Sequence, residues 1–103
     1  MIKYTSNGAL SPSGAKISAF FKVLSDEGRI RILTALLEEN LCVTHLCQKL
    51  SMEQSAVSHN LAILRKANLV KVSRSEKNRV YSIADEHVRL ILDMAILHLC
   101  EEN

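Results

Sequence analysis

Apolar residues recur every three or four positions along most of this chain, the spacing that places side chains on one face of an α-helix. The pattern predicts a first helix from about Gly14 to Leu24 and a second that starts after Ser25 or Asp26, because either side chain can cap a helix start. Residues 1–13 include the only proline and are expected to form a flexible N-terminal arm. Residues 14–103 then make one domain.

The next two apolar segments have the spacing of a helix–turn–helix. A short helix is expected over residues 41–50. A longer helix is expected after it, because Ser51 and Gln54 have the spacing of a capping box. Asn68 can end the longer helix in a left-handed conformation.

Residues 70–83 predict a β-hairpin. Val70 and Val72 alternate with polar residues, a looser alternation runs from Val80 to Ile83, and the polar segment RSEKN separates the two runs. The chain after Asp85 is again helical in pattern, but it is apolar on more than one side. The expected fold is therefore mainly α with a small β-hairpin, in a winged helix–turn–helix arrangement.

The charge is near neutral overall, at a formal +2, but it is unevenly distributed. Six lysines and arginines and a single acid lie between residues 54 and 82, which indicates an anionic partner for that segment. No apolar run is long enough to span a membrane and no signal peptide is evident, so we expect a cytoplasmic protein that does not contact a membrane. No nucleophile–base pair or glycine-rich phosphate loop is present, which argues against an enzyme.

The segment QSAVSHNLAILRKANLV resembles the DNA-reading segment of the ArsR/SmtB family of metal-responsive bacterial repressors. The preceding segment LSDEGRIRILTALLEENLCVTHL and the following segment KNRVYSI match that family's flanking pattern in the same order. The resemblance covers roughly residues 17–101. It implies a homodimeric winged helix–turn–helix that binds a twofold-symmetric operator in double-stranded DNA.

A recognition helix presents short polar side chains to the edges of the bases in the major groove. The candidates for base contacts are Gln54, Ser55, Ser58 and His59. The candidates for phosphate contacts are Arg65, Lys66, Arg74, Lys77 and Arg79. Each could be an ordinary solvated residue taken alone, but the basic hairpin beside the polar helix favours a DNA-binding surface.

The last helix has histidines and carboxylates at both ends. Its first turn has Asp85 and His87, and its last turn has His98 and Glu101. The two histidines share nearly one face but lie about 16 Å apart along the axis, so one helix cannot place both on one metal ion. In a dimer with antiparallel last helices, His87 lies level with the second copy's His98. Asp85 then lies level with the second copy's Glu101 to within one residue.

Two imidazoles and two carboxylates fit a four-coordinate Zn²⁺ site better than Cu(I) or Mg²⁺. We expect two symmetric sites per dimer. The same spacing resembles the C-terminal-helix zinc site of the ArsR/SmtB family, with no change of residue type. The seam between the helices is expected to contain Val88, Ile91, Leu92, Ala95 and Leu99, while Leu90, Met94 and Leu97 face the rest of the domain. The alternative is that Asp85 is only a helix cap and the other three are solvated.

Three cysteines, Cys42, Cys47 and Cys100, cannot all pair within one chain, and a reducing cytosol disfavours disulfides. Many family members place two thiolates in an ELCVCDL-like segment. This chain has NLCVTHL there: Cys42 matches the first thiolate, Thr44 replaces the second, and His45 stands where Asp is common. Cys42, His45 and Cys47 can form only a partial second metal site, and burial is the favoured interpretation for them.

The expected function is that of a zinc-responsive repressor whose metal-free dimer binds its operator and whose zinc-bound dimer releases it. The resemblance implies genes for zinc efflux or storage as targets, and a route from His98 to the region of Asn68. The first alternative is a thiol-based redox or persulfide sensor on the same fold that uses Cys100 with Cys42 or Cys47. The second is a winged helix without a sensor function.

Overall fold

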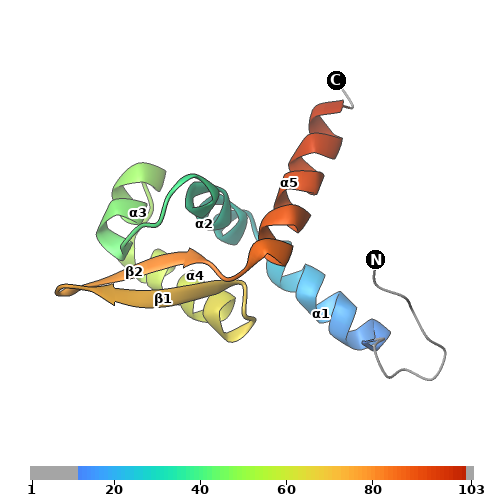
Figure 1. The fold of residues 1–103 in the computed structure, drawn as a ribbon, viewed down its shortest axis with the longest axis horizontal. Helices are drawn as coiled ribbons and strands as arrows, with labels where there is room; N and C mark the ends of the chain where they lie inside the picture. The colour runs from blue at the N-terminus through green and yellow to red at the C-terminus, as the bar shows by residue number, and fades with distance from the viewer. Residues whose placement is uncertain (1–11, 102–103) are drawn as a thin grey trace.

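The computed structural model describes residues 12–101. In chain order, the elements are α1 (Gly14–Leu24), α2 (Glu27–Glu38), α3 (Val43–Leu50), α4 (Gln54–Lys66), β1 (Val70–Ser75), β2 (Asn78–Ile83) and α5 (Glu86–Glu101). Figure 1 shows α2, α3 and α4 beside the hairpin, whereas α1 and α5 extend away from this central group. The predicted helix–turn–helix followed by a hairpin is confirmed. Most of the predicted N-terminal arm, residues 1–11, lies outside the described residues.

Helix α2 lies at the centre of the hydrophobic core. Asp26, one of its two predicted caps, accepts a hydrogen bond on Oδ2 from the N–H of Arg29 at 3.0 Å. Ile32, Leu33 and Leu36 of α2 are at most 1% exposed. They belong to one cluster with buried side chains of α3, α4 and the hairpin, which include Leu46, Val57, Leu61, Leu64, Val70 and Tyr81.

The turn between α3 and α4 differs from the prediction. Ser51 is not the cap of the longer helix but the end of the shorter one, and it adopts the left-handed conformation, with φ 53° and ψ 48°. The N–H of Met52 then bonds to the carbonyl of Cys47 at 3.1 Å, which satisfies a carbonyl of the last turn of α3. Helix α4 starts after Glu53, without a side-chain cap. The capping-box prediction is therefore wrong, because Ser51 ends α3 in the left-handed conformation and Glu53 occupies the N-cap position of α4.

The end of α4 agrees with the prediction for Asn68, whose φ is 61°. The N–H of Asn68 bonds to the carbonyl of Arg65, and the N–H of Leu69 bonds to the carbonyl of Leu64 at 2.9 Å. These two bonds form a Schellman motif. The chain reverses here, so that Leu69 and Val70 are buried at the start of the hairpin.

The hairpin pairs Val70 with Ile83 at one end and Ser75 with Asn78 at the other, around a two-residue turn. Its second strand also pairs with the segment before α3, through hydrogen bonds between Leu41 and Tyr81 of 3.1 and 2.8 Å. This pairing was not predicted, and it explains why α3 begins at Val43 rather than at residue 41. It fixes the hairpin to the helix–turn–helix.

Helix α5 projects from the domain and buries only two of its residues, Val88 and Leu92. Leu90, Met94 and Leu97 are 49–55% exposed, so the expectation that they face the rest of the domain is wrong. The expected dimer seam is wrong in part: Val88 and Leu92 lie in the domain core, whereas Ile91, Ala95 and Leu99 are exposed. Helix α1 buries no residue at all and exposes Ile17 and Phe21. No helix among residues 12–101 is long and apolar enough to cross a membrane.

Replacing Ser51 by Gly is expected to stabilise the protein by about 0.5–1 kcal/mol, because Gly adopts the left-handed conformation without the steric cost that Ser has there. Chemical denaturation of the two proteins measures the difference in the free energy of unfolding. A loss of stability of a few tenths of a kcal/mol, the usual effect of replacing a helix-capping serine by Gly, would contradict this account of the turn.

Candidate nucleic-acid interface and metal ligands

The polar side chains of α4 that were predicted to contact bases all lie on its solvent-exposed surface. Val57, Leu61 and Leu64 turn one face of the helix into the core. The residues predicted to contact bases, Gln54, Ser55, Ser58 and His59, are exposed. The core therefore fixes the helix while leaving short donors and acceptors available, as insertion into a DNA groove requires.

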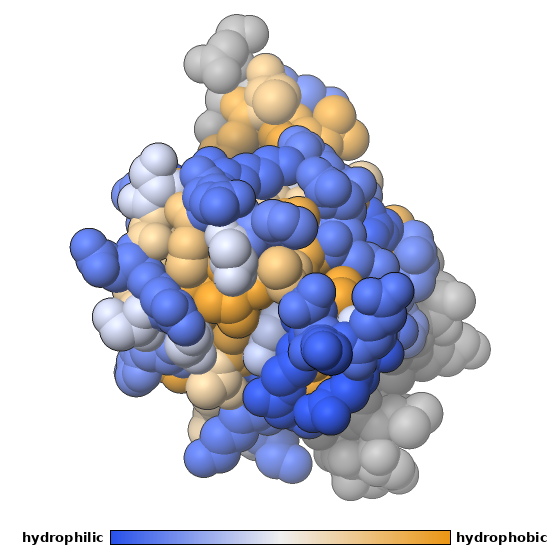
Figure 2. Space-filling model, turned by 90° about the vertical axis from the view of Figure 1, so that its left-hand side faces the viewer, coloured by the Kyte–Doolittle hydropathy of each residue, from blue (hydrophilic) through white to orange (hydrophobic). Residues whose placement is uncertain are grey.

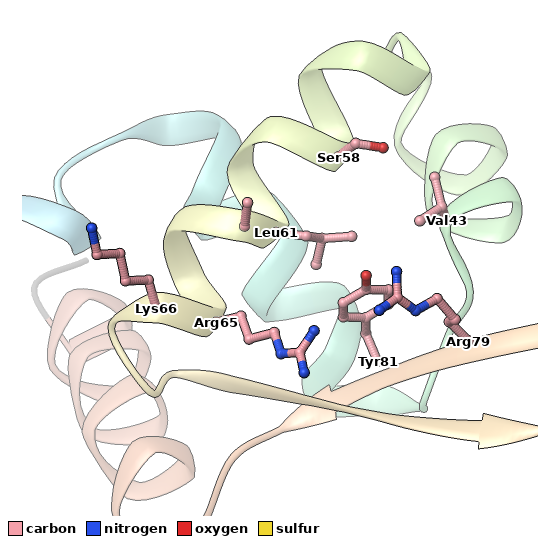
Figure 3. A pocket seen from close by; sticks show the side chains of 8 residues that line it. Val43, Ser58, Leu61, Arg65, Lys66, Arg79 and Tyr81 are labelled. Atoms are coloured by element: carbon pink, nitrogen blue, oxygen red, sulfur yellow. The ribbon is translucent and has the colours of Figure 1, made fainter.

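A hollow of about 620 Å³ separates α4 from β2 and is open to solvent. Its lining consists of Val43, Ser58, Leu61, Ala62, Arg65, Lys66, Arg79 and Tyr81. Figure 3 shows Arg65 from α4 and Arg79 from β2 extending toward the two sides of Tyr81, while Lys66 extends away from them. Tyr81 itself is only 9% exposed.

Arg65 and Arg79 are both predicted phosphate contacts, and the hollow brings them together. Within residues 12–101, the observed ion pairs involve other basic residues and leave both guanidinium groups without a carboxylate partner. Two guanidinium groups beside a tyrosine hydroxyl can bind one phosphate through charge-assisted hydrogen bonds. Sequence reasoning missed Tyr81, although the period of two along β2 places it on the same side of the strand as Arg79.

The tip of the hairpin supplies further exposed cations. Arg74 lies opposite Arg79 across the two strands, and Lys77 is in the two-residue turn. Figure 2 shows the end of the molecule that includes the hairpin tip and α3. Hydrophilic residues surround an apolar area in the middle of this face, and further apolar residues gather at the top, on α5. The predicted phosphate contacts thus lie on two neighbouring elements, α4 and the hairpin.

The four predicted metal ligands lie in two pairs at opposite ends of α5. Asp85 caps the helix, because its Oδ1 accepts a hydrogen bond from the N–H of Val88 at 3.0 Å. The same Oδ1 is 3.6 Å from Nδ1 of His87, and the His87 side chain is 86% exposed. His98 and Glu101 are exposed in the last turn. Residues 12–101 of one chain bring no three possible metal ligands together.

An apolar stripe connects the two pairs of possible ligands along one face of α5. Leu90, Ile91, Met94 and Leu97 are 38–55% exposed. They follow His87 at intervals of three, four, seven and ten residues, and His98 and Glu101 continue the same spacing, which places all of them on one side of the helix. One exposed surface therefore has an apolar middle and ligand-type residues at both ends.

The three cysteines are free thiols. Cys42 occupies the cap position of α3 without making a cap bond, and Cys47 is half-buried against the core. His45, on the same helix, is exposed, as is Cys100 at the far end of α5. These residues do not form a metal-binding group within the described part of the chain.

Comparison with known proteins finds close similarity. Residues 26–72 match the profile of the "Bacterial regulatory protein, arsR family". The chain is 40% identical over 88 residues to the "Transcriptional repressor SmtB homolog" of Synechocystis, which covers 85% of this chain and 67% of that one. It is 34% identical over 83 residues to the "Cadmium resistance transcriptional regulatory protein CadC homolog" of Staphylococcus aureus, covering 80% and 69%. The fold matches the homodimeric winged helix-turn-helix DNA-binding domain Mb0332 of Mycobacterium bovis, with a TM-score of 0.82, 22% identity and coverage of 99% and 93%.

Replacing Arg79 or Lys77 by Ala is expected to weaken binding to all DNA duplexes by a similar factor and to lower the salt slope by about 1, because each removes one phosphate contact. Replacing Ser58 or His59 by Ala should instead weaken binding mainly to a duplex selected from a random pool. Fluorescence anisotropy at several salt concentrations measures both effects.

The matched control is Lys16→Ala, which removes an exposed cation from α1, away from the hairpin. Its DNA affinity should remain near that of the wild type. Unchanged affinity in all four interface variants would exclude α4 and the hairpin as the DNA-binding surface.

Proposed function

Because this chain belongs to the arsR family of bacterial regulatory proteins, and is therefore a DNA-binding transcriptional regulator rather than an enzyme, we propose that it is a cytoplasmic, zinc-responsive repressor that acts as a homodimer. The metal-free dimer binds a twofold-symmetric operator, and zinc binding releases it. The observation that supports this proposal most strongly is the apolar stripe of α5 with possible metal ligands at both of its ends.

The exposed stripe supports pairing of α5 with a second copy of itself. In an antiparallel pair, the register that sets His87 beside His98 of the partner subunit also sets Ile91 beside Met94 of the partner subunit. Leu90 and Leu97 lie on the same side and add to the apolar contact. Burial of these side chains against a second copy removes apolar area from water, which favours association. Exposed Ile17 and Phe21 of α1 are available to extend the interface.

The same register places one complete ligand set at each end of the paired helices. Asp85 and His87 come from one chain, and His98 and Glu101 come from the other. Asp85 uses Oδ1 to cap α5, and its second carboxylate oxygen remains for a metal. Two imidazole nitrogens and two carboxylate oxygens suit tetrahedral zinc. Zinc bound there would hold the two α5 helices at one angle, and a dimer shape that misplaces the two α4 helices binds the operator less well.

A second candidate function is thiol-based sensing of oxidants or persulfides. The observation that favours it is the exposed free thiol of Cys100 on α5, together with Cys42 and Cys47 in or beside α3. Cys42, His45 and Cys47, in or beside the same helix, could also form a partial metal site. Both are separable from the α5 zinc site because they depend on different residues.

Mixing His87→Ala chains with His98→Ala chains is expected to restore one tight zinc site. Each proposed site takes His87 from one chain and His98 from the other, so the mixed dimer retains one complete site and one that lacks both histidines. Native mass spectrometry with a zinc chelator counts the tightly bound ions.

Each mutant homodimer, which lacks one imidazole in both sites, is the matched control and should retain no tight zinc. A mixed dimer that also retains none would show that the ligands are not shared between chains.

A variant with Cys42, Cys47 and Cys100 all replaced by Ser is expected to keep its zinc-dependent loss of DNA binding, because no thiol is a proposed ligand. Its stability should fall somewhat, since polar atoms enter apolar surroundings at Cys47. DNA binding with and without zinc, oxidant or persulfide tests this. If zinc has no effect on this variant, or if oxidant releases the wild type while zinc does not, thiol sensing is the better account.

A further inference from the structure

Helix α5 has a specific polar attachment to α2 in addition to its two buried residues. Nη1 of Arg89 donates a hydrogen bond to the carbonyl oxygen of Leu37 at 2.9 Å, and the two residues are 52 positions apart in sequence. Arg89 is half-buried and follows Val88, which packs into the core. The attachment therefore lies in the first turns of α5, next to Asp85 and His87.

The carbonyl of Leu37 needs a partner from outside its own helix. It belongs to the last turn of α2, where the carbonyl groups have no amide donor four residues further on in the helix. The backbone N–H four residues on, that of Leu41, bonds to the carbonyl of Tyr81 instead, at 3.1 Å. A cationic side chain is also favoured at this position because the C-terminal end of a helix has a partial negative charge. Arg89 thus supplies both the missing donor and the favoured charge.

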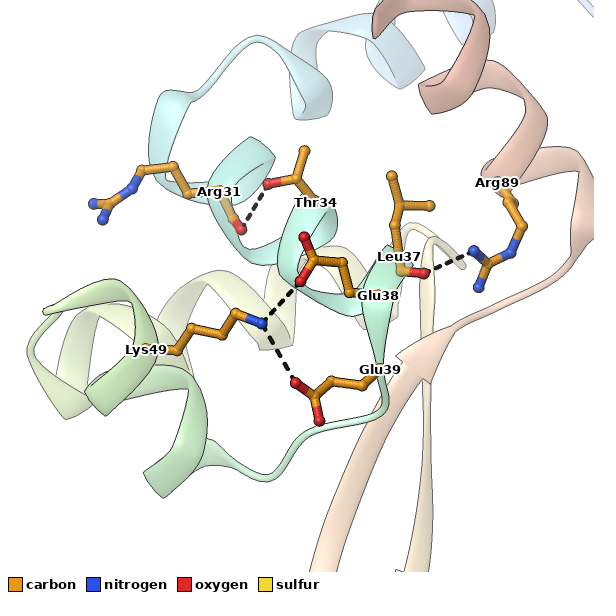
Figure 4. A network of polar contacts seen from close by, with 7 residues as sticks. All are labelled: Arg31, Thr34, Leu37, Glu38, Glu39, Lys49 and Arg89. Atoms are coloured by element: carbon orange, nitrogen blue, oxygen red, sulfur yellow. Dashed lines mark hydrogen bonds and ion pairs between the residues drawn. The ribbon is translucent and has the colours of Figure 1, made fainter.

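Nearby acids do not divert Arg89 from this carbonyl. Figure 4 shows Glu38 and Glu39, at the end of α2, directed toward Lys49 of α3. The Lys49 ammonium lies 3.1 and 3.4 Å from their carboxylates, and the hydrogen bond with Glu38 raises the pKa of Lys49 above its ordinary value. Each of the two basic side chains therefore has its own partner on α2.

The opposite end of α2 contacts the recognition helix. A Cβ atom added to Gly28 would lie 3.1 Å from Nδ2 of Asn60 in α4, so the two helices approach closely at this point. Nη1 of Arg29 also donates a hydrogen bond to Oδ1 of Asn60 at 3.4 Å. Between these ends, α2 is held by its fully buried residues. One continuous helix therefore connects the carbonyl that Arg89 binds to the contact with α4.

We propose that Arg89 is a positioning residue that sets the angle of α5 on the domain and transmits the orientation of α5 through α2 to α4. The inference rests on the proposed function, because the orientation that matters is the one that zinc imposes on the first turn of α5. Without the Arg89 hydrogen bond, α5 pivots about Val88 and Leu92, and metal binding moves α5 without moving α4.

The first test measures the angle of α5 in the metal-free protein and does not depend on zinc. Spin labels are attached to Cys100 and to a Glu27→Cys substitution, with Cys42 and Cys47 replaced by Ser. Labelled chains are diluted with an excess of unlabelled ones, so that almost no dimer contains two labelled copies. Pulsed electron paramagnetic resonance gives the distance distribution between α5 and α2. Arg89→Met should broaden it, and Arg89→Lys should partly restore its width, because Lys can still donate to the Leu37 carbonyl.

The matched control is Arg31→Met. Arg31 also donates from a guanidinium to a carbonyl in the last turn of a helix, that of Leu50 in α3. Figure 4 shows the Arg31 side chain directed away from Arg89 and α5. This substitution should leave the distance distribution unchanged. An unchanged distribution in Arg89→Met would overturn the positioning role, whatever zinc does.

The second test measures transmission as the ratio of the DNA dissociation constants with and without zinc. Arg89→Met should reduce this ratio by about fivefold or more, within the usual size of coupling between sites, while the DNA affinity of the metal-free protein stays near that of the wild type. By reciprocity, DNA must then weaken zinc binding by a correspondingly smaller factor. Arg31→Met should retain the wild-type ratio.

An unchanged ratio in Arg89→Met, or an equal fall in Arg31→Met, would overturn transmission through Arg89. A wild-type ratio of one would overturn the zinc-responsive function together with the transmission. The distance measurement would still decide whether Arg89 positions α5, so the two failures are distinguishable.

Discussion

The burial of α2 is the constraint on which the rest of the structure depends. Its fully buried face requires apolar partners from α3, α4 and the hairpin at once, and a well-packed core permits few alternative arrangements of those partners. The polar surface of α4 is exposed because its apolar face is committed to this core. The hollow between α4 and β2 depends on the same packing, because Leu61 and Tyr81, which line it from the two sides, belong to the core around α2.

Most of the fold could be predicted from local pattern because most of it is locally determined. The helical spacing of apolar residues indicated all five helices, and Asn68 marked the end of α4 by its tolerance of the left-handed conformation. Ser51 was misassigned because a serine three residues before a glutamine is equally compatible with a helix start and with the tight turn that precedes one. The pairing of Leu41 with Tyr81 joins distant segments by backbone atoms alone, and no side-chain pattern encodes it.

The functional sites were predictable only in part. The polar face of α4 and the basic hairpin followed from side-chain type, whereas the convergence of Arg65 and Arg79 on Tyr81 depends on how the hairpin folds back on the helix. On α5, periodicity alone could not decide which apolar face is buried, because Val88 and Leu92 differ little in character from Leu90 and Met94. The contact of Arg89 with a backbone carbonyl leaves no trace in sequence spacing, since any residue could supply that carbonyl.

The pairing of Leu41 with Tyr81 also affects the order in which the molecule is made. It closes the helix–turn–helix and the hairpin into one unit within a single chain, so this unit does not need a second copy in order to form. Two copies that pair through α5, as proposed, would therefore meet as bodies already folded and not as interleaved chains. Their assembly then obeys mass action. At low abundance, the concentration of such a pair would rise with the square of the protein concentration, and occupancy of the proposed twofold DNA site would respond steeply to the rate of synthesis.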